Sequence, residues 1–312
     1  MSVIRTSAPG SIMVMGEHSV LFGHRAIACA VDKRIHVTLA PRKDRRVTIT
    51  SALATYDSPL EQLAQEPRLS FVLYAIEQVA TSVPGGFDLI IESEFSHTVG
   101  LGSSAAVTAA VVKALAEYAS DTLDQFALFE RALTVVHGVQ GRGSGTDLVA
   151  SVYGGLIAYT VSPRHVTALS GLPPISLFYS GYKTRTPDVL GIVEEKAKLF
   201  PDIYHDIYTL MNRTSLQAEQ AITDQDWERL GALMNIYQGL MDSLGVNDMA
   251  LSELIYGLRA SDAVFGAKIS GSGLGDCVIT LGRATPVPDQ IAALYEEIPV
   301  AISQKGTECY VV

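Results

Sequence analysis

The sequence predicts an α+β protein built from two domains. Segments that alternate apolar and polar residues, as half-buried strands do, occur in the first half and again near the end, whereas helical periodicity dominates between them. A chain of 312 residues, of which 48% are hydrophobic, can bury a large core, and this length is typical of two domains. We therefore place a boundary near residue 165, giving domains over 1–165 and 166–312.

The first half of the chain mixes strands with helices. Residues 34–39 and 46–50 alternate with period two, which is typical of a strand with one buried face. Residues 60–80 place apolar side chains three and four positions apart, the spacing of one helix face. The predicted elements are strands at 34–39, 46–50, 87–91 and 154–160, and helices at 60–80, 104–118 and 123–136.

The second half is more helical before it returns to strands. Proline-containing segments at 162–165 and 171–174 separate it from the first half. The tail alternates again, which favours an α+β second domain. The predicted elements are helices at 187–200, 207–223, 226–244, 248–260 and 289–297, and strands at 267–270, 276–281 and 308–312.

Composition excludes several classes of protein. There are 33 acidic and 23 basic residues, a net charge of −10, so sequence-independent nucleic-acid binding is not expected. No apolar run approaches the roughly 20 residues of a membrane span, and the first residues lack a signal-peptide pattern. Three distant cysteines, Cys29, Cys277 and Cys309, predict neither a disulfide framework nor a zinc site. We expect a cytoplasmic protein.

A glycine-serine loop before a predicted helix is the first candidate site. Within residues 97–106, Gly100 and Gly102 allow the backbone to approach a ligand, and Ser103 or Ser104 can cap the following helix. The first amides of a helix carry a partial positive charge that suits a phosphate. An ordinary capped turn has the same pattern, so the loop alone leaves both interpretations open.

Three further glycine-bearing segments stand out. Residues 8–18 end in Glu17 and His18, which either serve a site or brace a turn. Residues 141–147 place Asp147 after three glycines, as a reactive acid or as a helix cap. Residues 268–276 lie between two strands, but their spacing and the missing downstream acid do not fit the dinucleotide fingerprint. A nicotinamide or flavin dehydrogenase is therefore not expected.

Together these four segments resemble the GHMP small-molecule kinases. They read A-P-G-x-I-x-x-x-G-E-H, G-L-G-S-S-A-A, S-G-x-D followed by Y-G-G, and S-G-S-G-L-G-D-C, in family order over nearly the whole chain. The resemblance implies a first domain like domain 2 of ribosomal protein S5 and a second, ferredoxin-like α+β domain. It also implies phosphoryl transfer from ATP, with Mg²⁺, to a small-molecule alcohol, and it raises the expectation of a homodimer.

The resemblance also implies roles for individual residues. Asp147 matches the catalytic aspartate, which takes a proton from the acceptor hydroxyl, and Ser104 matches the serine that contacts magnesium and phosphate. Residues expected to contact ATP are Gly100, Leu101, Gly102, Ser103, Ser104 and Ala105. Residues expected to contact the acceptor are Ser11, Glu17, His18, Gly145, Thr186, Gly271, Ser272 and Gly273.

Two positions depart from the family pattern. Ser11 stands where many relatives carry a lysine that orients the aspartate and balances its charge. We expect Lys183, or else Arg185, to supply that cation, and we count Lys183 as catalytic; an ordinary solvated lysine is the alternative. Val136 stands where a metal-binding glutamate is expected, with His137 beside it. Water, a phosphate oxygen and His137 are the candidates for that coordination site, and because histidine suits Mg²⁺ poorly, we expect water.

The acceptor is open between two branches of the family. Residues 16–31 most resemble kinases that phosphorylate mevalonate, whereas residues 137–154 and 275–277 resemble kinases that phosphorylate phosphomevalonate. A phosphorylated acceptor demands more than one cation, and Arg142, Lys183 and Arg185 are candidates. We expect mevalonate, with phosphomevalonate as the alternative. A catalytically silent metabolite sensor on this fold is a third possibility, because Ser11 and Val136 are changes that a decayed kinase can carry.

Overall fold

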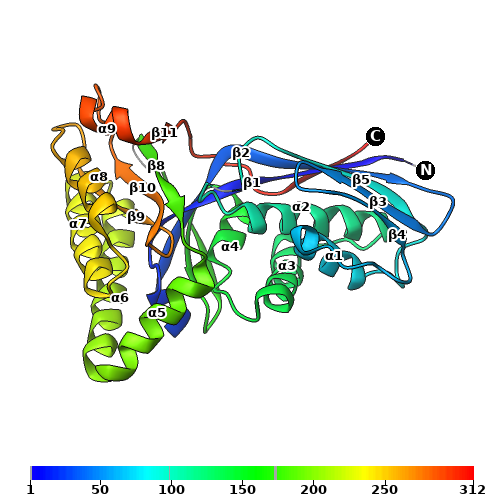
Figure 1. Ribbon diagram of the computed structural model, residues 1–312, viewed down its shortest axis with the longest axis horizontal. Helices are drawn as coiled ribbons and strands as arrows, with labels where there is room; N and C mark the ends of the chain where they lie inside the picture. The colour runs from blue at the N-terminus through cyan, green and yellow to red at the C-terminus, as the bar shows by residue number, and fades with distance from the viewer. Residues whose placement is uncertain (1, 98, 172–173) are drawn as a thin grey trace.

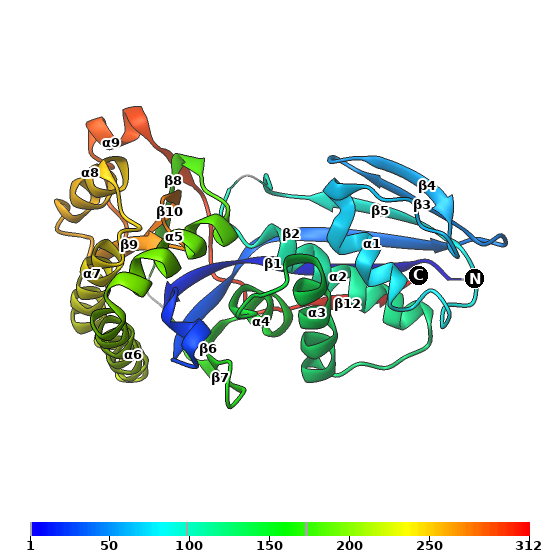
Figure 2. The ribbon, with the colours of Figure 1, turned by 60° about the horizontal axis from the view of Figure 1, so that its bottom comes forward.

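The computed structural model describes residues 2–97, 99–171 and 174–312. Two sheets, each with helices packed on one face, meet in the middle of an elongated molecule (Figure 1). The two ends of the chain lie close together at the far end of the first sheet (Figures 1 and 2). The α+β class predicted from the sequence is confirmed. Within these described ranges, no helix has both the length and the apolarity that crossing a membrane requires.

Among the described residues, the first sheet contains eight strands. Its order is β12-β1-β2-β5-β3-β4, with β6 and β7 continuing from β2. Helices α1 to α4 lie on one face of the sheet (Figure 1). Buried and less buried residues alternate at the start of β5, which indicates that the other face is open. The strands are β1 (Ile4–Met15), β2 (Ala26–Pro41), β3 (Arg46–Ser51), β4 (Thr55–Pro59), β5 (Phe87–Ser93), β6 (Leu156–Thr160), β7 (His165–Leu169) and β12 (Glu308–Val311). The helices are α1 (Ser70–Glu77), α2 (Ser103–Tyr118), α3 (Gln125–Gln140) and α4 (Thr146–Tyr153), with 3₁₀ turns η1 (Ser19–Phe22) and η2 (Pro67–Leu69).

Helix α2 supports the middle of the first sheet. Its buried face carries small residues, among them Ala106, Ala109 and Ala110, which let the helix approach β1 and β2 closely. Thr6 Oγ1 in β1 donates a 2.8 Å hydrogen bond to the carbonyl of Ala110. This packing fixes where α2 begins, and therefore fixes the glycine loop that precedes it.

In the part of the chain that the structure describes, the second sheet has four antiparallel strands in the order β11-β8-β10-β9. Helices α7 and α8 pack on it, and α6 packs against α7 (Figures 1 and 2). The strands are β8 (Ile175–Lys183), β9 (Gly266–Ser270), β10 (Gly275–Leu281) and β11 (Glu296–Ile298). The helices are α5 (Thr186–Leu199), α6 (Pro201–Thr223), α7 (Trp227–Ser243), α8 (Met249–Arg259) and α9 (Asp289–Leu294).

The two halves share apolar contacts at one end of the first sheet. Ile12 in β1 and Ile27 in β2 are buried with the core of the second sheet rather than with that of the first. The backbone amide of Met13 also donates a 3.0 Å hydrogen bond to Ser270 Oγ in β9. These contacts hold the glycine loops of both halves against one another.

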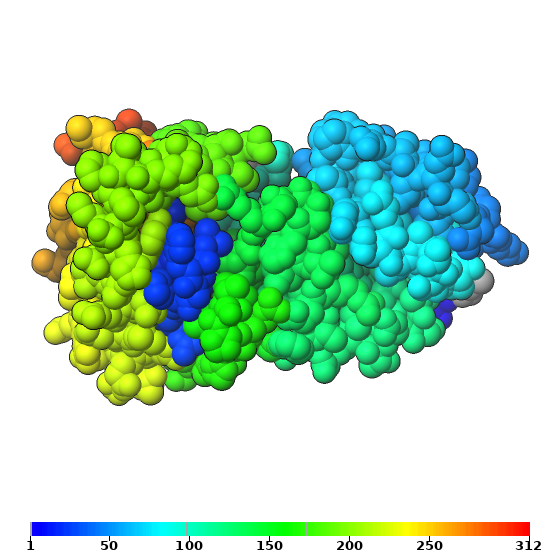
Figure 3. Space-filling model, turned by 90° about the horizontal axis from the view of Figure 1, so that it is seen from below, coloured from blue at the N-terminus to red at the C-terminus, as the bar shows by residue number. Residues whose placement is uncertain are grey.

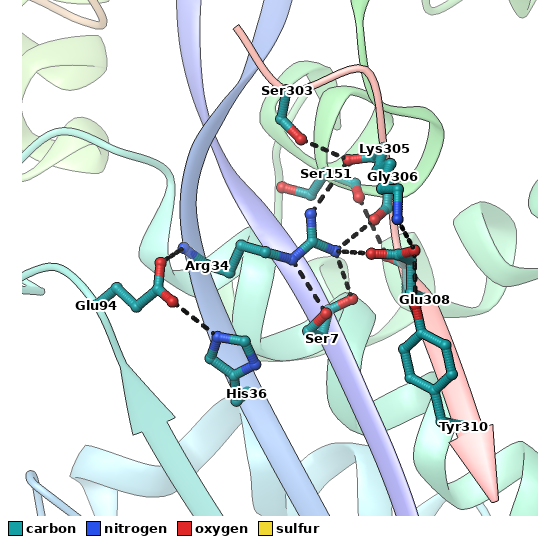
Figure 4. Close-up of polar contacts among 11 residues, drawn as sticks. Ser7, Arg34, His36, Glu94, Ser151, Ser303, Lys305, Gly306, Glu308 and Tyr310 are labelled. Atoms are coloured by element: carbon teal, nitrogen blue, oxygen red, sulfur yellow. Dashed lines mark hydrogen bonds and ion pairs between the residues drawn. The ribbon is translucent and has the colours of Figure 1, made fainter. Parts of the chain in front are cut away.

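The end of the chain returns to the first sheet. Strand β12 pairs with β1, and Arg34 in β2 anchors the approach to it (Figure 4). The Arg34 guanidinium donates to Ser7 Oγ at 3.0 Å and to the carbonyl of Gly306 at 2.6 Å, and it lies 3.5 Å from a Glu308 carboxylate oxygen. The chain therefore crosses between the sheets twice, before β8 and after β11. The division at residue 165 stays a prediction; β7 begins there, and it pairs with β6 in the first sheet.

Most predicted elements are present within a few residues, but the helix predicted at 60–80 is shorter. Helix α1 covers Ser70–Glu77 after the turn Pro67–Leu69. Pro67 biases the residue before it toward extended backbone, and Glu66 has φ −139° and ψ 102°. A helical spacing of apolar residues therefore continues through a segment whose backbone is not helical. No element was predicted at 175–183, where β8 lies.

Candidate active site

A cavity of about 1090 Å³ opens between the two halves, and we call it the cleft. Figure 3 shows the surface hollowed between the green atoms of the α5 segment and the blue and cyan atoms around β4 and α1. The cleft is lined by eleven predicted site residues: Glu17, His18, Gly100, Gly102, Ser103, Ser104, Asp147, Lys183, Thr186, Gly271 and Ser272. Five others do not line it: Ser11, Leu101, Ala105, Gly145 and Gly273.

The glycine loop before α2 needs both of its glycines. Gly102 has φ 62°, a left-handed conformation that favours glycine, and it occupies the N-cap position of α2. A Cβ atom on Gly102 would overlap Ser11 Oγ, and one on Gly100 would overlap the Asp276 carboxylate. The loop is therefore packed directly against polar side chains, and Gly102 has no side chain with which to cap the helix.

The serines after the loop face the cleft, whereas the neighbouring apolar side chains do not. The expected capping role of Ser103 or Ser104 is wrong, because both lie inside α2 and Gly102 is the cap. Leu101 is buried with the second core and Ala105 with the first, and neither lines the cleft, so their expected contact with ATP stays a prediction. The first amides of α2 remain free of a side-chain cap at a point where the helix dipole attracts anions.

Asp147 lies in the first turn of α4 and is held by Ser11. The Ser11 hydroxyl, fully buried in β1, donates a 2.9 Å hydrogen bond to Asp147 Oδ1. Burial raises the pKa of the Asp147 carboxyl above its ordinary value, while the Ser11 hydrogen bond and the charge of Lys183 act in the opposite direction. Ser11 thus lies behind Asp147 instead of at the cleft wall. Gly145, with φ 79°, forms the N-cap of α4 and packs toward Phe129.

Lys183 reaches the cleft from the end of β8. Its ammonium lies 2.9 Å from Asp276 Oδ2, at the start of β10. Burial raises the pKa of Asp276, and the neighbouring Lys183 charge opposes that rise. Thr186, at the start of α5, and the exposed Arg185 line the cleft beside this pair.

Glu17 and His18 are both buried at the other wall of the cleft. Glu17 forms an ion pair with Lys268 in β9, a residue that the sequence did not single out. His18 Nε2 lies 2.8 Å from the carbonyl oxygen of Ser272, and burial lowers the pKa of His18. Gly273, in the same loop as Ser272, instead packs against the backbone of Val246. These contacts join the first glycine segment of the chain to the last.

Lys268 has an environment unusual for a lysine. Its side chain is fully buried, donates to both Glu17 and the carbonyl of Ile269, and lies 5.4 Å from the centre of the Tyr237 ring. Burial lowers the pKa of Lys268, and the Glu17 carboxylate opposes this shift. The sequence did contain one signal that could have identified Lys268: a lysine within a strand predicted by alternation, next to a glycine loop.

Two further predicted features lie outside the cleft lining. Arg142 forms an ion pair with Glu194 in α5 and donates to the carbonyl of Pro187. His137 Nε2 lies 2.8 Å from the carbonyl oxygen of Gly143, so it stabilises its own loop. In this structure the Arg142 guanidinium is therefore paired outside the cleft lining.

The arrangement suits transfer of an anionic group. A helix N-terminus that attracts phosphate, a carboxylate that can take a proton and a lysine that can balance charge face one cavity. Positioned groups of these kinds are what phosphoryl transfer requires.

Comparison with known proteins defines the class. Residues 70–155 match the model for the GHMP kinases N terminal domain, and residues 218–299 match that for GHMP kinases C terminal. The chain belongs to the GHMP kinase family and is a phosphotransferase, and membership implies the use of ATP. This confirms the resemblance seen in the sequence.

The curated relatives are named more specifically. A mevalonate kinase from Aeropyrum pernix is 32% identical over 312 residues, covering 97% of this chain and 96% of its own length. A mevalonate kinase from Methanothermobacter thermautotrophicus is 33% identical over 274 residues, covering 88% of each. The crystal structure of the Lin0012 protein from Listeria innocua has a TM-score of 0.86 and 22% identity over 99% of both chains, which shows the same fold.

Proposed function

We propose that this protein transfers the γ-phosphoryl group of ATP to the hydroxyl group of mevalonate. The family and the names of its relatives support the reaction class and the acceptor. The observation that carries the proposal is the position of Asp147. Its carboxylate lies beside the glycine loop at the start of α2, held by Ser11 at 2.9 Å.

In this proposal Asp147 is the general base. Because Ser11 donates to Oδ1, the other oxygen, Oδ2, remains to accept the proton of the acceptor hydroxyl as its oxygen bonds to phosphorus. Such proton transfer contributes roughly 10²-fold to 10⁴-fold in rate. Lys183 supplies the positive charge that the family lysine would otherwise provide at position 11, since its charge favours the ionised form of Asp147.

The nucleotide phosphates fit the start of α2. The backbone of Gly102 and the first amides of the helix supply hydrogen-bond donors without a competing side-chain cap. Ser104, in the first turn and facing the cleft, would hold Mg²⁺ together with the phosphates and water, because Mg²⁺ needs few protein ligands. When bound, the ion neutralises charge that develops on the transferred group.

The charges around the cleft favour mevalonate over phosphomevalonate. Lys183 is already paired with Asp276, and Arg142 is paired with Glu194 outside the cleft lining. A second phosphate-sized charge would then depend on the exposed Arg185. An acceptor with a single carboxylate therefore fits this balance better than one that also carries a phosphate.

A coupled assay of ADP release tests the proposal. The purified protein is incubated with ATP, Mg²⁺ and one of four acceptors, namely mevalonate, phosphomevalonate, galactose or homoserine. We expect turnover with mevalonate at least about tenfold above the others in kcat/KM, a preference of about 1.4 kcal/mol. Preference for phosphomevalonate would replace the proposed acceptor. Acceptor binding without any ADP release would favour the silent sensor.

The remaining expectations about context are proposals as well. We propose that the protein works in the cytoplasm on small molecules, with neither nucleic acid nor membrane as a partner, and that it forms a homodimer. Light scattering coupled to gel filtration measures the oligomeric state, and a mass near 33.4 kDa would contradict the dimer.

A further inference from the structure

Asp276 occupies a position that is costly for an aspartate. It follows the loop over 271–275, its side chain is mostly buried, and its φ is 71°. Glycine takes that conformation more easily, and Gly273 and Gly275 in the same loop both have positive φ. Burial also disfavours a carboxylate. An aspartate at this position therefore calls for a compensating role.

The Asp276 carboxylate contacts both halves of the molecule. On one side, Oδ2 lies 2.9 Å from Lys183 Nζ, at the end of β8 in the second sheet. On the other, the carboxylate packs against Gly100, where a Cβ atom would overlap both of its oxygens. One side chain thus bridges the loop that precedes α2 and the lysine that faces it.

The glycine loop consequently lies between two carboxylates. Gly100 contacts Asp276, while Gly102 packs against Ser11 and lies near Asp147. The Lys183 charge acts on both acids. Without a cation between them, two carboxylates beside a phosphate-binding loop would repel the nucleotide.

We propose that Asp276 is a positioning residue for phosphoryl transfer: its ion pair holds Lys183 toward Asp147, and its contact with Gly100 seats the phosphate loop. The inference rests on the proposed function. The Lys183 side chain is 34% exposed, and Asp276 is its ion-pair partner among the described residues. Loss of this carboxylate frees a long, flexible side chain to turn toward solvent.

Two substitutions of Asp276 separate positioning from folding. Asp276→Asn keeps size and tolerance of positive φ but removes the charge, while Asp276→Gly also relieves the backbone conformation. We expect kcat to fall about 10-fold to 100-fold in both variants, because small misplacements of reacting groups cause losses of this size. We also expect the melting temperature of the glycine variant to equal or exceed that of wild type.

A double-mutant cycle with Lys183→Met tests whether Asp276 acts through Lys183. In the Lys183→Met background, we expect Asp276→Asn to change kcat less than about twofold, because the ion pair is already gone and asparagine keeps the size that fills the contact with Gly100. Asp262 is exposed, so Asp262→Asn is the matched control, and we expect it to keep the wild-type kcat.

The outcomes keep the two proposals distinct. An inactive wild-type protein overturns the proposed function and leaves no reaction for Asp276 to support. An active wild type with unchanged kcat in Asp276→Asn overturns the positioning role alone. A second result would also overturn the positioning role: both Asp276 variants melt at a lower temperature than wild type, and their losses in kcat multiply with the loss caused by Lys183→Met. This is the behaviour of a residue that only supports the fold.

Discussion

The Ser11 hydroxyl donates a 2.9 Å hydrogen bond to Asp147 Oδ1 from a fully buried position in β1. The family resemblance places a lysine at this position, and a hydroxyl can orient a carboxylate but cannot balance its charge. Positive charge instead comes from Lys183, on a strand of the other sheet. The resemblance assigns orientation and charge balance to one lysine, whereas here the hydrogen bond and the positive charge that act on Asp147 come from two residues on different halves of the molecule.

We expect Ser11→Ala to lower kcat at neutral pH. The variant removes a hydrogen bond to a charged group, worth about 1.5–3 kcal/mol, and so raises the pKa of Asp147 further. The acidic limb of the kcat profile should move to higher pH. Ser7→Ala, in the same strand but bonded to Arg34, is the matched control and should leave the profile in place. An unmoved limb in Ser11→Ala would remove Ser11 from this role.

Asp147→Asn tests the base directly. Asparagine keeps the size of the side chain but cannot take the proton, so we expect kcat to fall at least ~10²-fold. Nucleotide affinity, measured by calorimetric titration with ADP and Mg²⁺, should change little, because the phosphates are expected at the start of α2. Full activity in this variant would show that another group accepts the proton.

The same variant makes a prediction about stability and pH. The pKa of Asp147 is raised in the folded protein, so between its ordinary and raised values the folded state binds more protons than the unfolded state. The contribution of Asp147 to the free energy of unfolding therefore falls as pH rises through that window. We expect the melting temperature of Asp147→Asn to match wild type at low pH and to exceed it near pH 7. A lower value near pH 7 would mean that ionised Asp147 stabilises the fold.

Local pattern predicted much of the fold, because the open face of the first sheet leaves alternation in β2 and β3. Strand β8 was missed because four of its residues, Ile175–Phe178, are buried in succession between neighbouring strands and leave no alternation to read. The capping role expected of Ser103 or Ser104 was wrong because Gly102, in a left-handed conformation, already occupies the N-cap position.

The motifs predicted which segments come together, because Asp147 and the loop before α2 both line the cleft. Their roles stay predictions. Lys268 and Asp276 belong to the last glycine segment, but the motif assigned them no role. Their contacts, Glu17 and Gly100, lie far away in the chain, and spacing along a sequence carries no signal for such contacts.

Ser104→Ala should weaken the use of magnesium and nucleotide. Removing a hydroxyl that is expected to bind Mg²⁺ should raise the KM for MgATP and lower kcat, so that kcat/KM falls about 10-fold. Ser243→Ala, at an exposed serine of α7 that does not line the cleft, is the matched control and should keep wild-type kinetics. Titration of activity with Mg²⁺ at fixed ATP measures the difference. Equal kinetics in Ser104→Ala and wild type would exclude Ser104 from the site.

Lys268→Met is expected to destabilise the protein through Glu17. The variant leaves the Glu17 carboxylate buried without its partner, and breaking a buried pair in this way costs about 3–5 kcal/mol. The double variant Glu17→Gln with Lys268→Met removes both charges, so it should recover most of that loss. Urea unfolding monitored by circular dichroism gives the free energy of unfolding for each. If the single variant proves as stable as wild type, the ion pair does not hold β9 to the first half.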